Sequence, residues 1–346
     1  MELLKRLTEA FGVAGFENEV RSLVKNAMKE FCDEVRTDVM GNVIGYKKGK
    51  GRTSRRRSLM LCAHIDEIGF LVTHIDDNGF LRVDPVGGVN PKLSLSQRVI
   101  VCGRKHLFGV IGSKPIHILT EEEMKKQVEI KDMFIDVGLP KDKVKELVSV
   151  GDPVAFYQSF FRIGNHLCCK AMDDRVGVYV MLESLKEMKK HEVDVYAVAS
   201  TQEEVGLRGA VTSAFGVDPS IGIALDTTLA CDVPDTPAHQ RITELGKGVA
   251  IKIKDTSSIS NPLLVRHLKE IAEAKKIPYQ MEILPRGGTD AGAIQRTRAG
   301  VPTATLSIPT RYVHSVVECV HEEDVKSAVK LIVAYAEKAH EKDYTL

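Results

Sequence analysis

The stretch that decides the fold is Leu59-Met60-Leu61-Cys62-Ala63-His64-Ile65-Asp66. Its first five residues form an unbroken apolar run of strand length, which indicates a strand. The run ends in a histidine and an aspartate, two side chains that can bind metal or move a proton. In α/β sheets, ligands bind at the carboxyl ends of the strands, so we expect a functional site where this strand ends.

The sequence pattern changes directly after this strand, at Gly69. From there to about residue 163 the chain consists of short β-rich runs separated by turn residues, and no long amphipathic helix interrupts the first half. The expected elements are the strands Phe70–Ile75, Phe80–Val83, Arg98–Cys102 and Phe108–Ile111, with a turn at 76–79. We therefore predict that residues 69–163 form a small, mainly β domain inserted into the rest of the chain.

The segments on both sides of this insert have a regular α/β pattern. Apolar residues recur at helical spacing in Glu17–Phe31, and after Gly164 amphipathic helices alternate with apolar strands. The expected elements are a helix through 176–188, the strands 193–199, 221–225, 250–253, 279–284 and 303–308, and the helices 261–275 and 324–340. The most economical architecture is one three-layer α/β domain formed by residues 1–68 and 164–346.

The overall charge gives the protein no general attraction to polyanions. In 346 residues, 48 Lys and Arg stand against 47 Asp and Glu, which leaves a formal net charge of +1. This balance favours neither nucleic acid nor an anionic membrane as a partner. The basic stretch Lys47–Arg57 could be a local nucleic-acid patch. Its glycines, its hydroxyl residues and its lack of aromatic side chains favour a solvated hairpin loop between two strands.

The cysteines and the first residues predict a cytoplasmic location. The number of cysteines is odd and no pair has CxxC spacing, so we interpret all of them as reduced thiols of a cytosolic protein. Charged residues stand where a signal peptide would be apolar, and no apolar run has the length of a membrane span. The cysteines are Cys32, Cys62, Cys102, Cys168, Cys169, Cys231 and Cys319.

Several predicted strands end in side chains that bind metals or transfer protons. Two imidazoles and several carboxylates form the ligand set that suits Zn²⁺, Co²⁺ or Mn²⁺. Taken singly, each candidate also has a common structural explanation, as a helix cap, a solvated turn or a hydrogen-bonded surface histidine. The candidates are His64, Asp66, Glu203, Glu204, Asp226 and His314, together with Asp173, which with Asp174 precedes a helix.

The order and spacing of these candidates resemble the tetrahedral (TET) aminopeptidase family. Its members are dinuclear metallo-aminopeptidases that are also labelled glutamyl aminopeptidase or, in older usage, endoglucanase. The resemblance covers nearly the whole chain, including Leu245–Gly248, Gly287–Ala293 and the turn Asn78–Leu81. Five ordered motifs carry it: Ala63-His64-Ile65-Asp66-Glu67-Ile68-Gly69-Phe70, Ala171-Met172-Asp173-Asp174-Arg175-Val176-Gly177, Gln202-Glu203-Glu204-Val205-Gly206-Leu207-Arg208-Gly209-Ala210, Ala224-Leu225-Asp226 and Tyr312-Val313-His314-Ser315.

The resemblance implies two divalent metal ions per subunit, Zn²⁺ or Co²⁺, with Mn²⁺ as an alternative. It also implies a cis peptide bond between Asp173 and Asp174. The implied ligands are His64 and Asp226 for one ion, Glu204 and His314 for the other, and Asp173 as the bridge between both.

The same resemblance implies a metallo-aminopeptidase reaction, in which a metal-bridging water attacks the scissile carbonyl group. A metal pair activates such a water and polarises the carbonyl. A carboxylate that is not a ligand must still accept the proton of the water and pass it to the leaving amine, and Glu203 is implied as this general base. Asp66 is implied as the carboxylate that holds His64 in its metal-binding tautomer.

The resemblance also implies an assembly and cleavage at a free N-terminus, whereas the preference for the first residue is inferred from the charged residues of the chain. The insert is implied to be a PDZ-like dimerisation domain, and the dimers are implied to form a hollow tetrahedral dodecamer. The expected substrates are peptides with a free α-amine and a neutral or apolar first residue. An acidic first residue would require a desolvated cation nearby. Arg286, Arg296 and Arg311 are candidates, although pairing with local carboxylates or exposure is the favoured interpretation of each.

Two other functions remain open from the sequence. One is an N-acyl amino acid deacylase or a carboxypeptidase on the same scaffold, because a metal centre does not determine which end of a substrate is bound. The other is a non-catalytic scaffold that forms a shell, which would be marked by loss of the base or of a ligand. A glycosidase is disfavoured because it needs two metal-free carboxylates beside the sugar.

Overall fold

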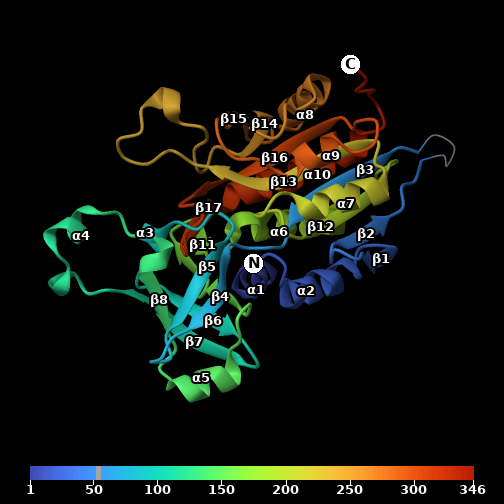
Figure 1. Ribbon diagram of the computed structural model, residues 1–346. Coiled ribbons are helices and arrows are strands. Elements are labelled where there is room, and N and C mark those ends of the chain that lie inside the picture. The colour runs from blue at the N-terminus through green and yellow to red at the C-terminus, as the bar shows by residue number, and fades with distance from the viewer. Residues whose placement is uncertain (52–55) are drawn as a thin grey trace.

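The computed structural model describes residues 1–51 and 56–346, and these residues form two separate β structures (Figure 1). A large sheet is built from both ends of the chain. A closed barrel is built from strands that lie between Gly69 and Phe156. The predicted fold class, an α/β domain interrupted by a small β domain, is therefore confirmed.

The large sheet contains 11 strands within the described residues. Its four central strands, in the order β12, β3, β13 and β16, run parallel to one another, so their carboxyl ends meet at one edge. In spatial order the strands are β1 (Glu34–Thr37), β2 (Val43–Lys47), β12 (Asp194–Ser200), β3 (Ser58–His64), β13 (Ile221–Leu229), β16 (Thr303–Arg311), β17 (Glu318–His321), β11 (His166–Cys169) and β10 (Phe161–Ile163), with β14 (Val249–Lys254) beside β16 and β15 (Tyr279–Ile283) beside β14.

Helices cover both faces of this sheet, which gives the three layers. Successive side chains of a strand point to opposite faces of the sheet, so the apolar side chains of β3 contact helices on both faces. Leu59 and Leu61 pack in the cluster that contains α6 and α10, whereas Met60 and Cys62 pack in the cluster that contains α7 and α9. No helix in the described part of the chain has the length and apolarity needed to cross a membrane. The helices are α1 (Glu2–Glu9), α2 (Asn18–Met28), α6 (Met172–Glu187), α7 (Arg208–Val217), α8 (Pro262–Lys275), α9 (Ala291–Gln295) and α10 (Glu322–Lys338), with a 3-10 turn η4 (Ala238–Gln240).

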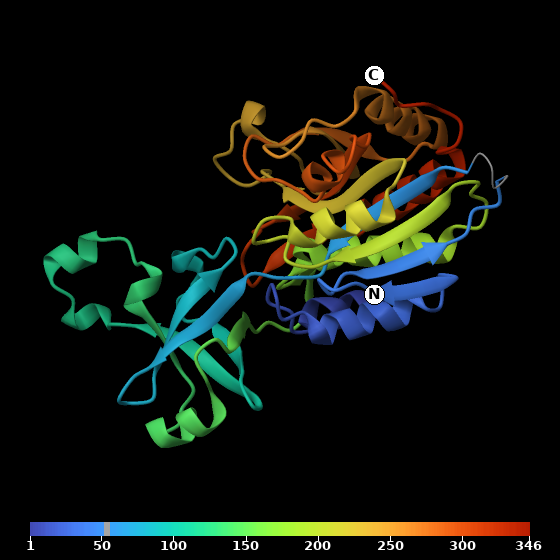
Figure 2. The same cartoon turned by 45° about the vertical axis from the view of Figure 1, so that its right-hand side comes forward.

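The insert closes into a barrel that projects to one side of the large sheet (Figure 2). Its core is a separate apolar cluster, in which the rings of Phe70 and Phe156 pack edge to face with their centroids 5.5 Å apart. The barrel order is β4 (Gly69–Ile75), β5 (Leu81–Val86), β8 (Met133–Asp136), β7 (His106–Ser113), β6 (Arg98–Cys102) and β9 (Pro153–Phe156), with the helices α3 (Pro91–Ser94), α4 (Glu121–Lys125) and α5 (Lys141–Leu147) and the 3-10 turns η2 (Ile116–Ile118) and η3 (Ile130–Asp132).

The prediction of a hairpin across Lys47–Arg57 is wrong. Strand β12 lies between β2 and β3 and pairs with both, antiparallel to β2 and parallel to β3. β2 and β3 are therefore not adjacent in the sheet, because a strand from later in the chain lies between them. Residues 52–55 of this basic stretch lie outside the described part, and Arg56, which follows them, pairs with Asp194 of β12 at 3.1 Å.

The prediction that all the cysteines are reduced is also wrong. Cys168 and Cys319 form a disulfide, while the other five cysteines are free. The two partners lie directly opposite each other on the antiparallel strands β11 and β17, with their Cα atoms 4.4 Å apart. They are separated by 151 residues along the chain, so local cysteine spacing could not indicate the pair.

Candidate metal centre

The structure brings the predicted ligand and base side chains to the edge where the central parallel strands end. They line a cleft of about 470 Å³. They come from five different segments of the chain, as expected for a site built at strand ends. His64 ends β3, Glu203 and Glu204 follow β12, Asp226 lies on β13, His314 follows β16, and Asp173 lies at the start of α6.

Asp173 lies between the two histidines. Its Oδ1 atom is 3.2 Å from Nε2 of His64, and its Oδ2 atom is 3.7 Å from Nε2 of His314. The same Nε2 atom of His314 lies 3.4 Å from Oε1 of Glu204. The two oxygens of one carboxylate thus face two different imidazoles. The peptide bond between Asp173 and Asp174 is cis, which confirms that prediction.

Potential donor atoms converge in two groups, each within 4.8 Å: His64 with Asp173 and Glu204, and His64 with Asp174 and Asp226. Asp174 is not among the predicted ligands. Its Oδ2 atom accepts the backbone N–H of His64 at 3.2 Å, and its Oδ1 atom accepts that of Gly177 at 3.1 Å. Both oxygens of Asp174 therefore already accept backbone N–H groups, which suits a residue that holds the backbone of His64 in place.

Asp66 contacts both the imidazole of His64 and the loop that carries Glu203 and Glu204, here called the glutamate loop. Its carbonyl oxygen lies 3.2 Å from Nδ1 of His64, and its carboxylate Oδ1 lies 3.5 Å from the same nitrogen. The carboxylate also accepts the backbone N–H groups of Glu203 at 2.9 Å and of Glu204 at 3.1 Å. The contact with the glutamate loop was not anticipated from the sequence. Asp66 is fully buried, so these contacts are shielded from water.

The imidazole of His314 forms a hydrogen bond with the backbone of the insert. Its Nδ1 atom lies 3.0 Å from the carbonyl oxygen of Gly88, in the connection after β5. A backbone carbonyl at Nδ1 orients the ring so that Nε2 faces Asp173 and Glu204. Position 88 has no room for a side chain, because a Cβ there would lie 2.6 Å from this imidazole nitrogen. The insert therefore contributes directly to the geometry of the cleft.

Glu318 is a residue of this site that the sequence did not single out. It begins β17 and is buried. Its two carboxylate oxygens accept the backbone N–H groups of Asp173 at 3.0 Å and of His314 at 2.7 Å. Burial and the charge of Asp173 raise the pKa of Glu318 to about 8. In the sequence, only its position four residues after His314 could have indicated a role at this site. That spacing alone does not distinguish Glu318 from a surface glutamate.

Acidic side chains are concentrated in the cleft. Burial and neighbouring carboxylates raise the pKa values of Glu203 and Asp226 well above their usual range. Burial alone would lower the pKa of His314, but the carboxylates of Glu204 and Asp173 raise it to about 10. The ammonium group of Lys252, which also lines the cleft, lies 3.1 Å from a carboxylate oxygen of Glu282. Lys252 is therefore already paired with another carboxylate.

This set of donor groups fits divalent metal ions. The Nε2 atoms of His64 and His314 point toward carboxylate oxygens, while their Nδ1 atoms face backbone carbonyls. Such carbonyls fix the tautomer in which Nε2 carries a free lone pair. Buried carboxylates that raise one another's pKa values repel each other, and cations placed among them would offset that repulsion.

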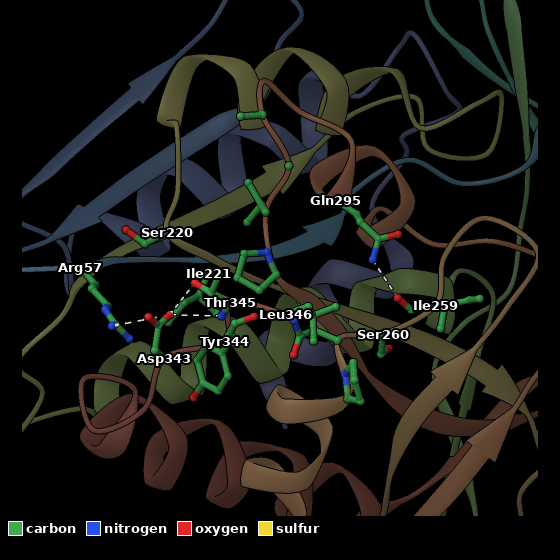
Figure 3. A pocket seen from close by; sticks show the side chains of 16 residues that line it. Arg57, Ser220, Ile221, Ile259, Ser260, Gln295, Asp343, Tyr344, Thr345 and Leu346 are labelled. Atoms are coloured by element: carbon green, nitrogen blue, oxygen red, sulfur yellow. Dashed lines mark hydrogen bonds and ion pairs between the residues drawn. The ribbon is translucent and has the colours of Figure 1, made fainter.

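A larger hollow of about 690 Å³ lies beside the C-terminal segment (Figure 3). Arg57, Gln295 and Thr345 are among the residues that line it, and none of the predicted site residues does. Volume alone therefore does not locate the functional site. The convergence of histidines and carboxylates at the strand ends does so.

Comparison with known proteins identifies the family. The family profile described as M42 glutamyl aminopeptidase matches residues 41–331. An aminopeptidase from the archaeon Desulfurococcus kamchatkensis is 44% identical with a TM-score of 0.93, covering 97% of this chain and 94% of that chain. The lysyl aminopeptidase of Pyrococcus furiosus is 38% identical over 99% of both chains.

A third relative is known for its assembly. The TET1 peptidase of Pyrococcus horikoshii, which can assemble into a tetrahedron or a large octahedral shell, is 35% identical with a TM-score of 0.84, covering 97% of this chain and 98% of that chain. The family profile spans most of the sequence, and these relatives span nearly all of it. The chain therefore belongs to the M42 aminopeptidase family, and it is a peptidase.

Proposed function

We propose that this aminopeptidase uses two divalent metal ions to remove residues from the free N-terminus of peptides. His64 and Asp226 would bind one ion, Glu204 and His314 would bind the other, and Asp173 would bind both. The placement of Asp173 is the observation that carries this proposal, because its two oxygens face the Nε2 atoms of two different imidazoles. That is the arrangement a bridging carboxylate requires.

Zn²⁺ or Co²⁺ suits this donor set best, and Mn²⁺ is also compatible, because imidazoles and carboxylates together form a borderline ligand set. When bound, the metal pair would polarise the scissile carbonyl group and lower the pKa of a water molecule. The protein contributes ligands that are held before the metals arrive. Asp66, Asp174 and Glu318 provide this support through hydrogen bonds to backbone amides of the ligand segments.

Glu203 would act as the general base. One of its carboxylate oxygens lies 3.9 Å from Nε2 of His64, and its backbone N–H is held by Asp66 at 2.9 Å. The carboxylate therefore borders the ligands while it remains available to a water molecule. A carboxylate in this position can accept a proton from the water molecule and deliver it to the leaving amine.

The cleft favours a neutral first residue. Its apolar lining offers burial to an aliphatic side chain, and each buried methylene group contributes about 0.8 kcal/mol. The acidic groups Glu203 and Glu204 lie close enough to the cleft to attract a free α-ammonium group. The apolar lining residues are Leu207, Leu229, Leu284 and Val313.

The three arginines considered from the sequence have different surroundings. Arg311 forms a two-point ion pair with Asp232, at 2.7 and 2.8 Å, and Arg296 donates to the carbonyl oxygen of Gly292. Arg286 lines the cleft but is exposed, so water screens its charge. A desolvated cation that would select an acidic first residue is therefore not supplied by any of the three.

A substrate panel tests this preference. We expect leucyl and alanyl p-nitroanilides to be hydrolysed faster than lysyl and glutamyl ones, because only the former gain from the apolar lining without burying a charge. N-acetyl-leucyl p-nitroanilide, the matched control, should not be hydrolysed, since it lacks the ammonium group. A dominant glutamyl rate would refute the preference. Release of p-nitroaniline from the acetylated substrate would refute the need for a free α-amine, whereas release of acetate would favour the deacylase alternative.

We also propose that the barrel forms a dimer interface and that the dimers assemble into a dodecamer. The assembly of the Pyrococcus horikoshii relative supports this proposal. The barrel carries exposed apolar side chains on β7, where Phe108 is 65% and Val110 is 47% exposed. Covering such side chains is a typical result of subunit association. A cytoplasmic location stays a prediction.

Light scattering tests the assembly. We expect the wild type to form a particle of about twelve chains, and Phe108→Glu to shift the population to smaller species, because a buried unpaired carboxylate opposes association. Val39→Glu is the matched control, since Val39 is a fully exposed apolar residue outside the barrel. A monomeric wild type at neutral pH would contradict the proposal, and so would an unchanged particle for Phe108→Glu.

A further inference from the structure

One buried carboxylate connects two segments of the metal centre that are far apart in the sequence. Glu318 is 2% exposed, and it accepts the backbone N–H of Asp173 through Oε2 and that of His314 through Oε1. Asp173 lies at the start of α6, whereas His314 lies in the loop after β16. Among the described residues, Glu318 is the hydrogen-bond acceptor found for each of these two amides.

We infer that Glu318 is a positioning residue that sets the separation between Asp173 and His314, and so completes the site of the second metal ion. This inference rests on the proposed function, because it takes both residues as ligands. His314 has φ near +61°, a conformation that is uncommon for residues other than glycine. The 2.7 Å hydrogen bond from its N–H to Glu318 helps to hold the residue in this conformation.

The position of Glu318 is itself fixed by the sheet. Strand β17 lies between β16 and β11 and pairs with both. Glu318 is directly opposite Cys169 of β11, and the next pair along, Cys168 and Cys319, is joined by the disulfide. β11 leads into the start of α6, which carries Asp173. The pairing of β17 with β11 therefore fixes Glu318 relative to the segment that carries Asp173. The hydrogen bond from the His314 N–H to the Glu318 side chain then fixes His314 relative to the same segment.

The chain contains a matched control for this arrangement. Asp324, at the start of α10, is also buried, and its two oxygens accept the backbone N–H groups of Gly246 and Gly248 at 2.7 Å each. Burial raises its pKa to about 6. Its amide partners belong to a surface turn, and it contacts none of the proposed metal ligands. Asp324 therefore has the same hydrogen-bonding role as Glu318 without the link to the metal centre.

The test compares Glu318→Gln with Asp324→Asn. Each substitution replaces one acceptor oxygen by an amide NH₂ group, so one backbone N–H loses its partner. Zn²⁺ binding to the metal-free full-length chain is measured by competition with a chromophoric chelator, alongside thermal unfolding. We expect both variants to unfold at lower temperature. Only Glu318→Gln should bind its second Zn²⁺ more weakly, by about 10- to 100-fold, the effect typical of residues that support a metal ligand.

The outcomes separate this inference from the proposed function. A wild type that binds fewer than two Zn²⁺ ions would overturn both. A wild type with two ions, together with unchanged binding to Glu318→Gln, would overturn the inference alone, as would an equal loss of the second ion in Asp324→Asn. If Glu318→Gln is not recovered folded, Glu318→Asp gives the same test, because its shorter carboxylate keeps the charge but cannot reach both amides.

Discussion

Glu203→Gln is expected to lower kcat by about 10²- to 10⁴-fold while the protein keeps its fold and both metal ions, because that range is typical for loss of a general base. Glutamine preserves the size of the side chain but cannot accept a proton. The backbone N–H of residue 203 would still be held by Asp66, so the loop should keep its position. Kinetics with leucyl p-nitroanilide, with metal content measured on the same sample, tests this expectation.

Glu204→Gln is the informative counterpart to that variant. Glu204 lies 3.4 Å from Nε2 of His314 and is proposed as a ligand, so its substitution should weaken binding of one ion. The two variants are therefore expected to have different defects. Glu203→Gln should lose turnover and keep its metal ions, whereas Glu204→Gln should bind metal more weakly. A Glu203→Gln enzyme that keeps more than half of the wild-type rate would show that Glu203 is not the base.

The parts of the fold that sequence predicts best are those determined by local patterns. β3 is an apolar run that ends in His64, and the structure has the strand ending at that residue. The elements predicted after Gly164 occur in the predicted order, but β11, α7, α9 and β17 were not predicted. Because parallel strands present their carboxyl ends at one edge, the convergence of His64, Glu204 and Asp226 follows from topology once the strands are placed.

Three features that the sequence could not predict depend on residues distant along the chain. The insertion of β12 between β2 and β3 replaced an expected hairpin. The disulfide joins Cys168 to Cys319 because two strands happen to place them opposite each other. A carbonyl oxygen at Gly88 has no sequence signature at all, since every residue carries one. Its role at His314 appears only when the barrel is docked against the large sheet.

The choice between Asp173 and Asp174 shows where geometry adds to a motif. Both are acidic and adjacent, and each falls in a group of potential donor atoms that includes His64. The oxygens of Asp174 are occupied by backbone N–H groups of His64 and Gly177, whereas those of Asp173 face two imidazole nitrogens. This difference is the reason that we propose Asp173 as the bridge and Asp174 as its support.

Asp173→Asn is expected to remove most bound metal and to reduce activity more than about 100-fold, the upper value for residues that merely support a ligand. An amide offers one oxygen and one NH₂ group, so it could serve one ion at most, and the NH₂ group would repel the other. Asp174→Asn, the matched control, should keep both ions with moderately weaker affinity. Elemental analysis after dialysis against a weak chelator, with activity measured on the same samples, compares the two. If Asp174→Asn loses both ions while Asp173→Asn keeps them, the bridging role belongs to Asp174.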